Sequence, residues 1–279
     1  MTPDHGRMPA GWGAAVSLGA MRHAILAAAT GFWLWTAVAA AQDINPDRPD
    51  LTTGADIVPA RSLQIESGIE YGRERVGGHS TVRELQVQTS LRLGLTPALE
   101  ISVDGVPFVW ERTGGDHQGS GDYTLGFKYR FLAPSPDGAG PALGVKPFVK
   151  LPVAREPIGS ERPDFGALLL MSIGLPWSLS LDANAGVAAI GVRGPDGFIP
   201  QGIVAASLSW SVAEQLSTIT ELYYTTKNER DGRYGLLTTV ALMYRVTPNL
   251  ALDTGMRTTL AGQGPSWSAF VGLSVRLGR

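Results

Sequence analysis

Charged side chains alternate with apolar ones along much of the chain, an arrangement suited to ion pairing and to orienting polar groups. Segment 122–131 shows it most clearly, because Lys128 and Arg130 alternate with Tyr129 and Phe131. Successive side chains of an extended strand point to opposite faces, so this segment has one charged face and one apolar, aromatic face. The two faces must therefore meet different surroundings.

The same alternation places fifteen residues on the charged face of their segments. A Lys or Arg side chain facing the middle of a bilayer costs about 2–4 kcal/mol, so these groups must meet water or one another. Either they form a mixed-charge path that orients a passing solute, or they neutralise each other and fill a narrow interior. They are Glu66, Glu70, Arg92, Glu100, Asp104, Lys128, Arg130, Lys146, Lys150, Asp182, Glu221, Arg245, Asp253, Arg257 and Arg276.

Bond-making chemistry has little support in the sequence. Only His79 and His117 follow residue 41, and both fall in predicted loops. His117 is close in sequence to Asp116 and Ser120, but no predicted strand orients it as the base of a nucleophilic serine. Two isolated histidines without cysteine cannot build the usual nitrogen and sulfur metal sites. We predict no catalytic residue, no metal and no cofactor, and hence a protein that is not an enzyme.

Twelve predicted β-strands position the charged residues. They are joined by short turns, such as 96–98, and by longer polar loops, such as 111–121. Ten or fourteen strands are alternatives, because strand limits taken from sequence shift by about two to four residues. The twelve are 63–75, 81–95, 99–110, 122–131, 143–151, 165–175, 179–189, 202–212, 215–226, 234–246, 250–259 and 266–277.

Two architectures can satisfy such strands. A soluble sandwich turns the apolar faces inward, whereas a membrane barrel turns them outward to lipid and keeps the polar faces in the lumen. Charged residues make up 17% of the chain, below the roughly 25% of an average soluble domain. Short turns at one end and longer loops at the other are typical of outer-membrane barrels. We therefore predict an all-β fold, an antiparallel transmembrane barrel of the outer membrane with about twelve strands.

The N-terminus has the layout of an export signal. A basic pair at 22–23 precedes the uncharged stretch 24–41, which ends in small residues. We expect cleavage after Ala41, with Ala39 as the alternative site. An uncleaved helical anchor is the competing interpretation. Removing this leader changes the formal charge from −2 to −3, so no basic excess predicts a nucleic-acid partner.

The chain therefore divides into three predicted parts. Residues 1–41 form the signal peptide, with Met21 as an alternative start, and residues 62–279 form the barrel. Residues 42–61 form a lead-in with several prolines and no sustained alternation. This lead-in either folds into the lumen as a plug or remains a solvated periplasmic tail. The charged residues that would pair inside the lumen in the first case are Asp47, Arg48 and Asp50.

Other features qualify the simple alternation. The run 168–171 is apolar on both faces, which fits either contact with a plug or ligand or a packed inner layer of side chains. Pro107, Pro147 and Pro200 remove ladder donors and mark bulges, strand ends or imperfect pairing, where a barrel wall can open.

Aromatic residues near the strand ends form either a girdle at the lipid headgroups or ordinary core. They are Tyr71, Trp110, Tyr123, Tyr129, Phe131, Trp177, Trp210, Tyr224, Tyr244 and Trp267.

Five short motifs follow the leader. They are N-P-D-R-P-D at 45–50, L-Q-I-E-S-G at 63–68, G-L-T-P at 94–97 leading into 99–101, G-D at 121–122, and G-L-S-V-R-L at 272–277. With these motifs, the mature chain resembles Gram-negative outer-membrane proteins of the MetA-pathway phenol degradation family, which is also described as a transporter family. The resemblance spans essentially the whole mature chain. One departure is the C-terminus, because such barrels usually finish on an aromatic residue that aids assembly, whereas this chain ends in Leu-Gly-Arg.

The resemblance implies an outer-membrane β-barrel that moves small, often aromatic or apolar, compounds. We therefore expect passive passage of small molecules through the lumen or a lateral gap in the wall. The expected partners are outer-membrane lipid, the barrel assembly machinery and a small-molecule solute, with no nucleic acid. The alternatives are a structural or adhesive barrel with a filled lumen, a lipid-modifying enzyme, and a soluble periplasmic ligand-binding barrel.

Overall fold

A computed structural model describes residues 43–76, 80–135, 140–192, 197–227 and 229–278. The predicted signal peptide and His79 lie outside these residues. The described part contains thirteen strands: β1 (Leu63–Val76), β2 (Ser80–Thr96), β3 (Leu99–Arg112), β4 (Asp116–Gly119), β5 (Tyr123–Leu132), β6 (Pro141–Leu151), β7 (Asp164–Leu175), β8 (Leu179–Gly191), β9 (Phe198–Ala213), β10 (Leu216–Thr225), β11 (Gly235–Thr247), β12 (Leu250–Gly262) and β13 (Trp267–Leu277).

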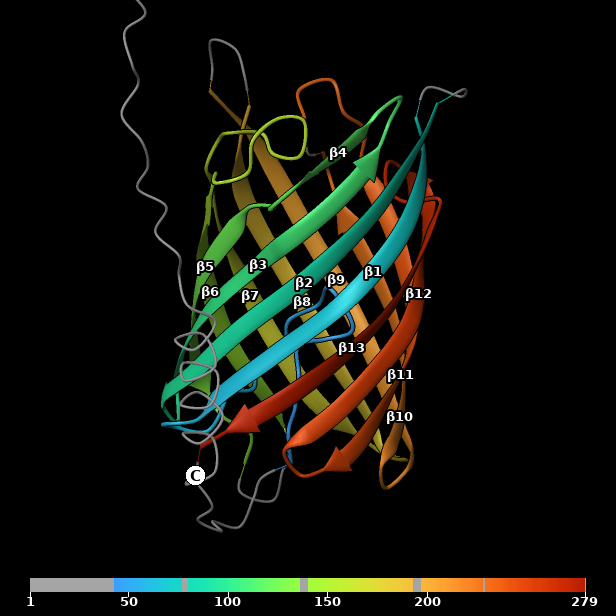
Figure 1. Ribbon diagram of the computed structural model, residues 1–279. Coiled ribbons are helices and arrows are strands. Elements are labelled where there is room, and N and C mark those ends of the chain that lie inside the picture. Colours follow the sequence, from blue (N-terminus) through green and yellow to red (C-terminus); the bar gives the residue numbers. More distant parts are fainter. Residues whose placement is uncertain (1–42, 77–79, 136–139, 193–196, 228, 279) are drawn as a thin grey trace, which may run out of the picture. The chain divides into compact units, whose positions relative to one another are not determined.

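The strands close into an antiparallel barrel (Figure 1). Each long strand pairs with its neighbours in sequence, and the circle closes where β1 pairs with β13 along Leu63–Arg73. The short strand β4 pairs only with the end of β3. Twelve of the described strands therefore form the wall, which confirms the predicted all-β antiparallel barrel. We call the end that carries the turns 97–98, 176–178, 214–215 and 248–249 the turn end, and the opposite end the loop end.

Some predicted loops were wrong in part. The loop between the predicted strands 179–189 and 202–212 is shorter than expected, because β9 begins at Phe198. The loop between the predicted strands 250–259 and 266–277 is likewise shorter, since β12 continues to Gly262. The loop predicted at 111–121 contains β4. In the first two cases a strand continues beyond the membrane-facing alternation, and in the third a separate short strand pairs with the end of β3. Backbone pairing with a neighbour stabilises each of these segments.

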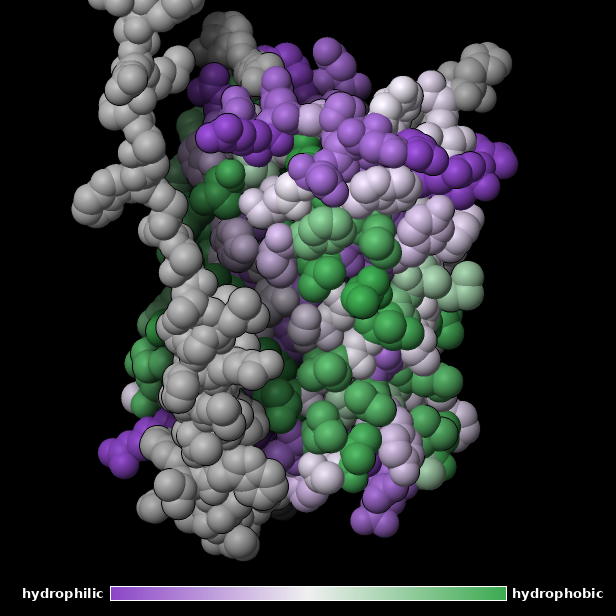
Figure 2. Space-filling view, in the orientation of Figure 1, coloured by the Kyte–Doolittle hydropathy of each residue, from purple (hydrophilic) through white to green (hydrophobic). Residues whose placement is uncertain are grey.

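The outer surface of the barrel is apolar, as expected for contact with lipid. Outward side chains such as Leu169, Val187 and Val271 are 60%, 69% and 57% exposed. Figure 2 shows apolar residues over the middle of the barrel and hydrophilic residues along its loop end. Among the predicted girdle residues, those with exposed side chains lie near the strand ends: Tyr129, Phe131, Trp177, Trp210, Tyr244 and Trp267. No helix in the described ranges is both long and apolar enough to cross a membrane.

The lead-in runs inside the barrel and contains no strand in its described part, 43–62 (Figure 1). Its Ala55 packs with Ala142 and Leu170, both only 2% exposed, and Leu168 lies against them. The apolar run 168–171 thus alternates after all. Leu169 faces outward, while Leu168 and Leu170 lie against the lead-in. Of the two interpretations of this run, contact with a segment inside the lumen is the one observed.

The wall is interrupted beside β5. Pro107 lies at a bulge, where the register between β2 and β3 shifts between Val87 and Thr89. Pairing of β3 with β5 ends at Gly105, and beyond it β3 pairs with β4 instead. Residues 120–122, which join β4 to β5, are not in a strand. The strand of the wall that pairs with β3 is therefore broken into β4 and β5. This agrees with the prediction that Pro107 marks a place of imperfect pairing.

The lead-in joins the wall over Gly94, and this contact gives a stability prediction. The backbone N–H of Arg61 donates to the carbonyl oxygen of Gly94 at 2.8 Å. A Cβ added at Gly94 would lie 2.1 Å from the carbonyl oxygen of Val58. We expect Gly94→Ala to displace the lead-in backbone and lower the free energy of unfolding by about 1–3 kcal/mol, measured by urea unfolding in detergent. Gly174→Ala is the control, because its Cβ would have no neighbour within 4 Å. Equal stabilities of the two variants would contradict this account.

Candidate functional site

The densest group of charges surrounds Arg92. Its guanidinium binds Glu66 and Glu100, each at 2.8 Å, and Lys128 lies 3.7 Å from Glu100. Both cations also bind Asp47 of the lead-in, at 3.3 Å from Arg92 and 3.2 Å from Lys128. The four barrel residues are each 1% exposed. Because removing one partner of a buried ion pair costs about 3–5 kcal/mol, this cluster ties the lead-in firmly to the wall.

The other predicted lumen charges also lie on the inner face, and most meet an opposite charge. Some of them also make hydrogen bonds to uncharged groups: Asp182 accepts one from Ser172, Arg276 donates one to the side chain of Asn249 at 2.7 Å, and Glu221 accepts one from Thr52. The ion pairs join Arg48 to Asp253, Arg257 to Glu70, Lys146 to Asp104, Lys150 to Asp122 and Asp164, Arg130 to Asp56, and Arg245 to Asp43.

Arg48 of the lead-in occupies a space made by two facing glycines. Gly68 of β1 and Gly272 of β13 are paired across the strands. A Cβ at Gly68 would lie 2.3 Å from a guanidinium nitrogen of Arg48, and one at Gly272 would lie 2.6 Å from it. The guanidinium donates to Asp253 at 3.0 Å and to Gln88 at 3.0 Å. Residues without side chains on the wall thus make room for this cation.

Lumen side chains also bind the backbone of the lead-in. One carboxylate oxygen of Glu221 accepts hydrogen bonds from the N–H groups of Leu51 and Thr52, both at 2.7 Å, and from the Thr52 hydroxyl at 2.8 Å. Asn184 accepts from the N–H of Thr53 and donates to its carbonyl oxygen, both at 2.8 Å. A segment without a strand partner thereby has its backbone groups satisfied.

Two cavities lie on opposite sides of the lead-in. The loop-end cavity has a volume of about 470 Å³ and the turn-end cavity about 370 Å³, and Arg48 and Asp50 line both. The loop-end cavity combines a few polar groups with apolar side chains. Its lining includes Asp104, Lys146, Phe148, Leu168, Ile203 and Tyr223. Volumes and linings of this kind are typical of sites for small molecules.

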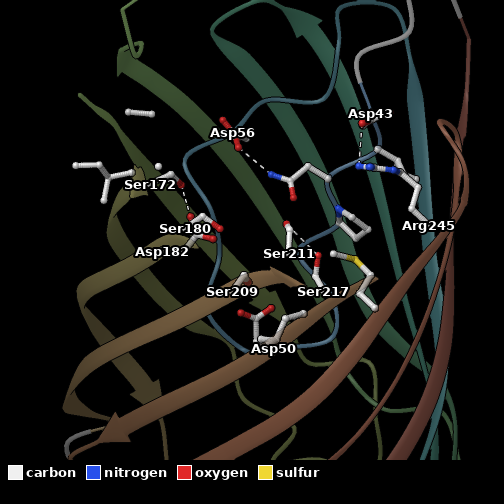
Figure 3. Close-up of a pocket in the computed structure, with 18 of the residues that line it drawn as sticks. Asp43, Asp50, Asp56, Ser172, Ser180, Asp182, Ser209, Ser211, Ser217 and Arg245 are labelled. Carbon is white, nitrogen blue, oxygen red and sulfur yellow. Dashed lines mark hydrogen bonds and ion pairs between the residues drawn. The ribbon is translucent and has the colours of Figure 1, made fainter. Parts of the chain in front are cut away.

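The turn-end cavity is more polar (Figure 3). Hydroxyl groups from β7 to β10 and carboxylates from the lead-in and β8 surround it, with Arg245 at its edge. The hydroxyls belong to Ser172, Ser180, Ser209, Ser211 and Ser217, and the carboxylates to Asp43, Asp50, Asp56 and Asp182. A solute that passes from one cavity to the other would therefore exchange a partly apolar lining for a polar one.

Two neighbouring aspartates of the lead-in have opposite pKa shifts. Burial alone would raise the pKa of Asp47, but the charges of Arg92 and Lys128 hold that pKa below its usual value. Burial raises the pKa of Asp50 well above its usual value, and the nearby charge of Glu221 adds to the effect. The surroundings in the lumen thus favour the charged form of Asp47 and the neutral form of Asp50.

His117, for which the sequence predicted no catalytic role, lies in a different setting from the predicted loop. His117 lies in β4, where it is exposed and pairs with Glu111 across the strands. Asp116 instead binds Arg112, with one hydrogen bond of 2.8 Å. Within the described ranges, no hydrogen bond joins His117 to Asp116 or Ser120.

Sequence reasoning missed the uncharged residues that hold the lead-in and line the loop-end cavity. Asn184, Ser172 and Gln88 bind the lead-in, while Phe148 and Tyr223 line the cavity. The alternation contained the signal for four of them, because Asn184, Gln88, Phe148 and Tyr223 each lie an even number of positions from a predicted lumen charge on their own strand. Strand β7 carries no predicted lumen charge, so Ser172 had no such signal. The search considered only charged residues and so omitted them.

The raised pKa of Asp50 predicts pH-dependent docking of the lead-in. A group whose pKa is higher in the docked state favours docking when protonated, so docking weakens as pH rises from 3.8 through the raised pKa. The pKa of Asp47 is lowered in the docked state, so its favourable contribution to docking is lost as the pH falls below 3.8. Asp50→Asn should remove the upper dependence and protect the Thr52 and Thr53 amides at neutral pH. Hydrogen exchange, corrected for intrinsic rates, measures this protection, and equal pH profiles for the two proteins would refute it.

Comparisons with known proteins agree with this architecture. The sequence matches the family described as "Putative MetA-pathway of phenol degradation" over residues 46–277. The fold is similar to that of an outer membrane channel from Pseudomonas putida F1, with a TM-score of 0.66, 13% identity, and coverage of 84% of this chain and 100% of that one.

The NanC porin structure is a more distant match, with a TM-score of 0.50, 12% identity, and coverage of 77% of this chain and 100% of that one. At such identities these likenesses describe the fold alone. No curated protein sequence matches the chain significantly. The fold is that of an outer-membrane β-barrel, and by its sequence the chain belongs to the "Putative MetA-pathway of phenol degradation" family.

Proposed function

We propose that the protein is an outer-membrane channel for the passive passage of small molecules. The observation that carries this proposal is the pair of lumen cavities, of about 470 and 370 Å³, on opposite sides of the lead-in. Both lie inside the barrel, and Arg48 and Asp50 border each of them. The lead-in is therefore the barrier between two spaces that are large enough for a small solute.

The lining of the loop-end cavity favours a small solute with both an apolar and a polar part. Phe148 and Tyr223 offer aromatic surface, while Lys146 and Asp104, 3.3 Å apart, offer charged groups. Aromatic side chains bind flat apolar groups, and a few polar groups fix their orientation. A small aromatic compound with a hydroxyl group has this character, and the description of the family points to the same class.

A lateral route through the wall is consistent with the same cavity. Gly105, Val106 and Thr124 line it, and they lie where the pairing of β3 with β5 ends. Just beyond, residues 120–122 interrupt the wall strand. An apolar solute that enters from the lipid would meet fewer backbone hydrogen bonds here than elsewhere in the wall.

The remaining expectations belong to the same proposal. Residues 1–41 would be a cleaved export signal, and the barrel assembly machinery would insert the chain into outer-membrane lipid. The protein would have no enzymatic activity, since its histidine in β4 is exposed and has no orienting partner. The turn end would face the periplasm, because short turns are periplasmic in barrels of this type.

The first competing function is a structural or adhesive barrel with a permanently filled lumen. The extensive ion pairing around Arg92 favours it, because a buried network of this kind resists rearrangement. A conductance measurement separates the two functions, since a filled barrel carries no current and a channel does.

Glu221 offers a way to release the barrier. Glu221→Ala should leave the N–H groups of Leu51 and Thr52 without acceptors, at a cost of about 1–3 kcal/mol each, and detach this part of the lead-in. We expect a small single-channel conductance for the refolded mature wild type and a larger one for the variant. Liposome swelling with a small neutral solute should follow the same order.

The matched control is Glu214→Ala, which removes an exposed carboxylate in a turn between β9 and β10. Its conductance should equal that of the wild type. The shift in gel mobility on heating shows whether each protein is folded. If both the wild type and Glu221→Ala are folded and neither carries current, the filled barrel is supported and the channel is rejected.

A further inference from the structure

Three arginines lie directly opposite one another on adjacent strands near the loop end. Arg73 of β1 is paired with Arg83 of β2, and Arg83 is paired with Arg112 of β3. Arg75, two residues along β1 from Arg73, extends the row toward the loops. Paired residues share a face of the sheet and have Cβ atoms about 4.5–5.5 Å apart, so these guanidinium groups crowd one another.

The row faces the outside of the barrel. Arg73 and Arg83 lie an odd number of positions from Glu70 and Gln88, which face the lumen on the same strands. The pair of Arg83 with Arg112 lies beyond the Pro107 bulge and shares its face with the pair of Leu85 with Trp110, two residues away. Arg83 and Arg112 are exposed. Figure 2 shows hydrophilic residues gathered at this end, over the upper ends of β1 to β3. These charges thus contribute nothing to the lumen network.

Most of this row has no ion-pair partner in the part of the chain that the structure describes. Among the described residues, no ion pair is formed by Arg73, Arg75 or Arg83. Only Arg112 has such a partner, Asp116, at 2.8 Å. Like charges directly opposite on neighbouring strands destabilise a sheet. On the outward face, a row of four cations beside one carboxylate would be stabilised by anions from outside the chain.

The position of the row indicates where those anions come from. One outward position nearer the middle of the barrel, the paired residues are Tyr71, Leu85 and Trp110. The Tyr71 ring lies 5.8 Å from that of Trp267, which is itself paired with Arg73. Aromatic rings of this kind lie at the level of the lipid headgroups. The arginines follow about 7 Å farther along the strands, at the level of the headgroup charges.

A shallow cavity completes the surface. It has a volume of about 480 Å³ and lies between β2 and the turn that joins β3 to β4. Its lining consists of Thr81, Arg83, Arg112, Gly114, Gly115 and Asp116, and the Asp116 carboxylate pairs with Arg112. Guanidinium groups bind phosphate through two parallel hydrogen bonds, and the small turn residues leave room for a sugar or phosphate group.

We propose that this outward arginine row binds the phosphates of a phosphorylated glycolipid in the outer leaflet of the outer membrane. Arg73, Arg75 and Arg83 bind the phosphates, and the rings of Tyr71, Trp110 and Trp267 lie beside the sugar and the upper acyl chains. The lipid neutralises the like charges that face one another across the strands. The inference depends on the outer-membrane orientation of the barrel and is independent of solute passage.

The test uses the full mature protein refolded in a zwitterionic detergent. The probes are lipid A with two phosphates and the same lipid with its phosphates removed. Phosphorylated lipid A should raise the thermal unfolding midpoint of the wild type, and added salt should weaken its binding. Arg73→Gln with Arg83→Gln should weaken binding about tenfold or more, since each arginine near anionic lipid contributes appreciably to affinity.

The control pair is Arg155→Gln with Arg162→Gln, which removes the same charge from the exposed loop 152–163. Its binding should equal that of the wild type. Three results would each overturn the proposal: equal wild-type binding of the dephosphorylated lipid, an unchanged affinity in the Arg73 and Arg83 variant, or the same stabilisation by inorganic phosphate alone. The comparison of the two lipids on the wild type needs no variant to fold.

Discussion

Hydrocarbon offers no partner to a charged side chain or to a free backbone N–H group, and the arrangement of this barrel follows from that constraint. The wall satisfies its backbone by closing on itself where β1 meets β13. At the depth of the hydrocarbon, charged side chains that alternate with apolar ones can then only face the lumen. Arg92, Glu66 and Glu100 meet there because all of them lie on the inner face of neighbouring strands.

The lead-in obeys the same constraint from inside. It has no strand partner in its described part, so its N–H groups find side-chain acceptors on the wall, chiefly Glu221, Asn184 and Ser172. Its own charges complete ion pairs that the wall leaves open, as Asp47 does between Arg92 and Lys128. The charged residues that line the lumen are therefore largely those that hold the lead-in within it. In the proposed channel, the passage of solutes depends on how strongly the lead-in is held.

The two faces of the loop end have opposite charge. Glu74, Glu84 and Glu111 lie on the inner side of β1 to β3, while Arg73 and Arg83 lie on the outer side of the same strands. Along β1 to β3, a single alternation thus gives the lumen side an acidic rim and the lipid-facing side a basic one. The acidic rim meets water and solute, and the basic rim meets whatever anions the membrane surface supplies.

The sequence by itself determined the strands, their inward charges and the barrel class, because side chains of a strand alternate whatever surrounds it. Lys128 and Arg130 already implied a polar interior. Only the tertiary structure decided which charges meet, since Asp253 and Arg48 are 205 residues apart and their contact depends on closure of the wall. It also decided that the lead-in lies in the lumen and that Leu170 packs against Ala55, because both follow from the space left inside a closed barrel and not from any local pattern.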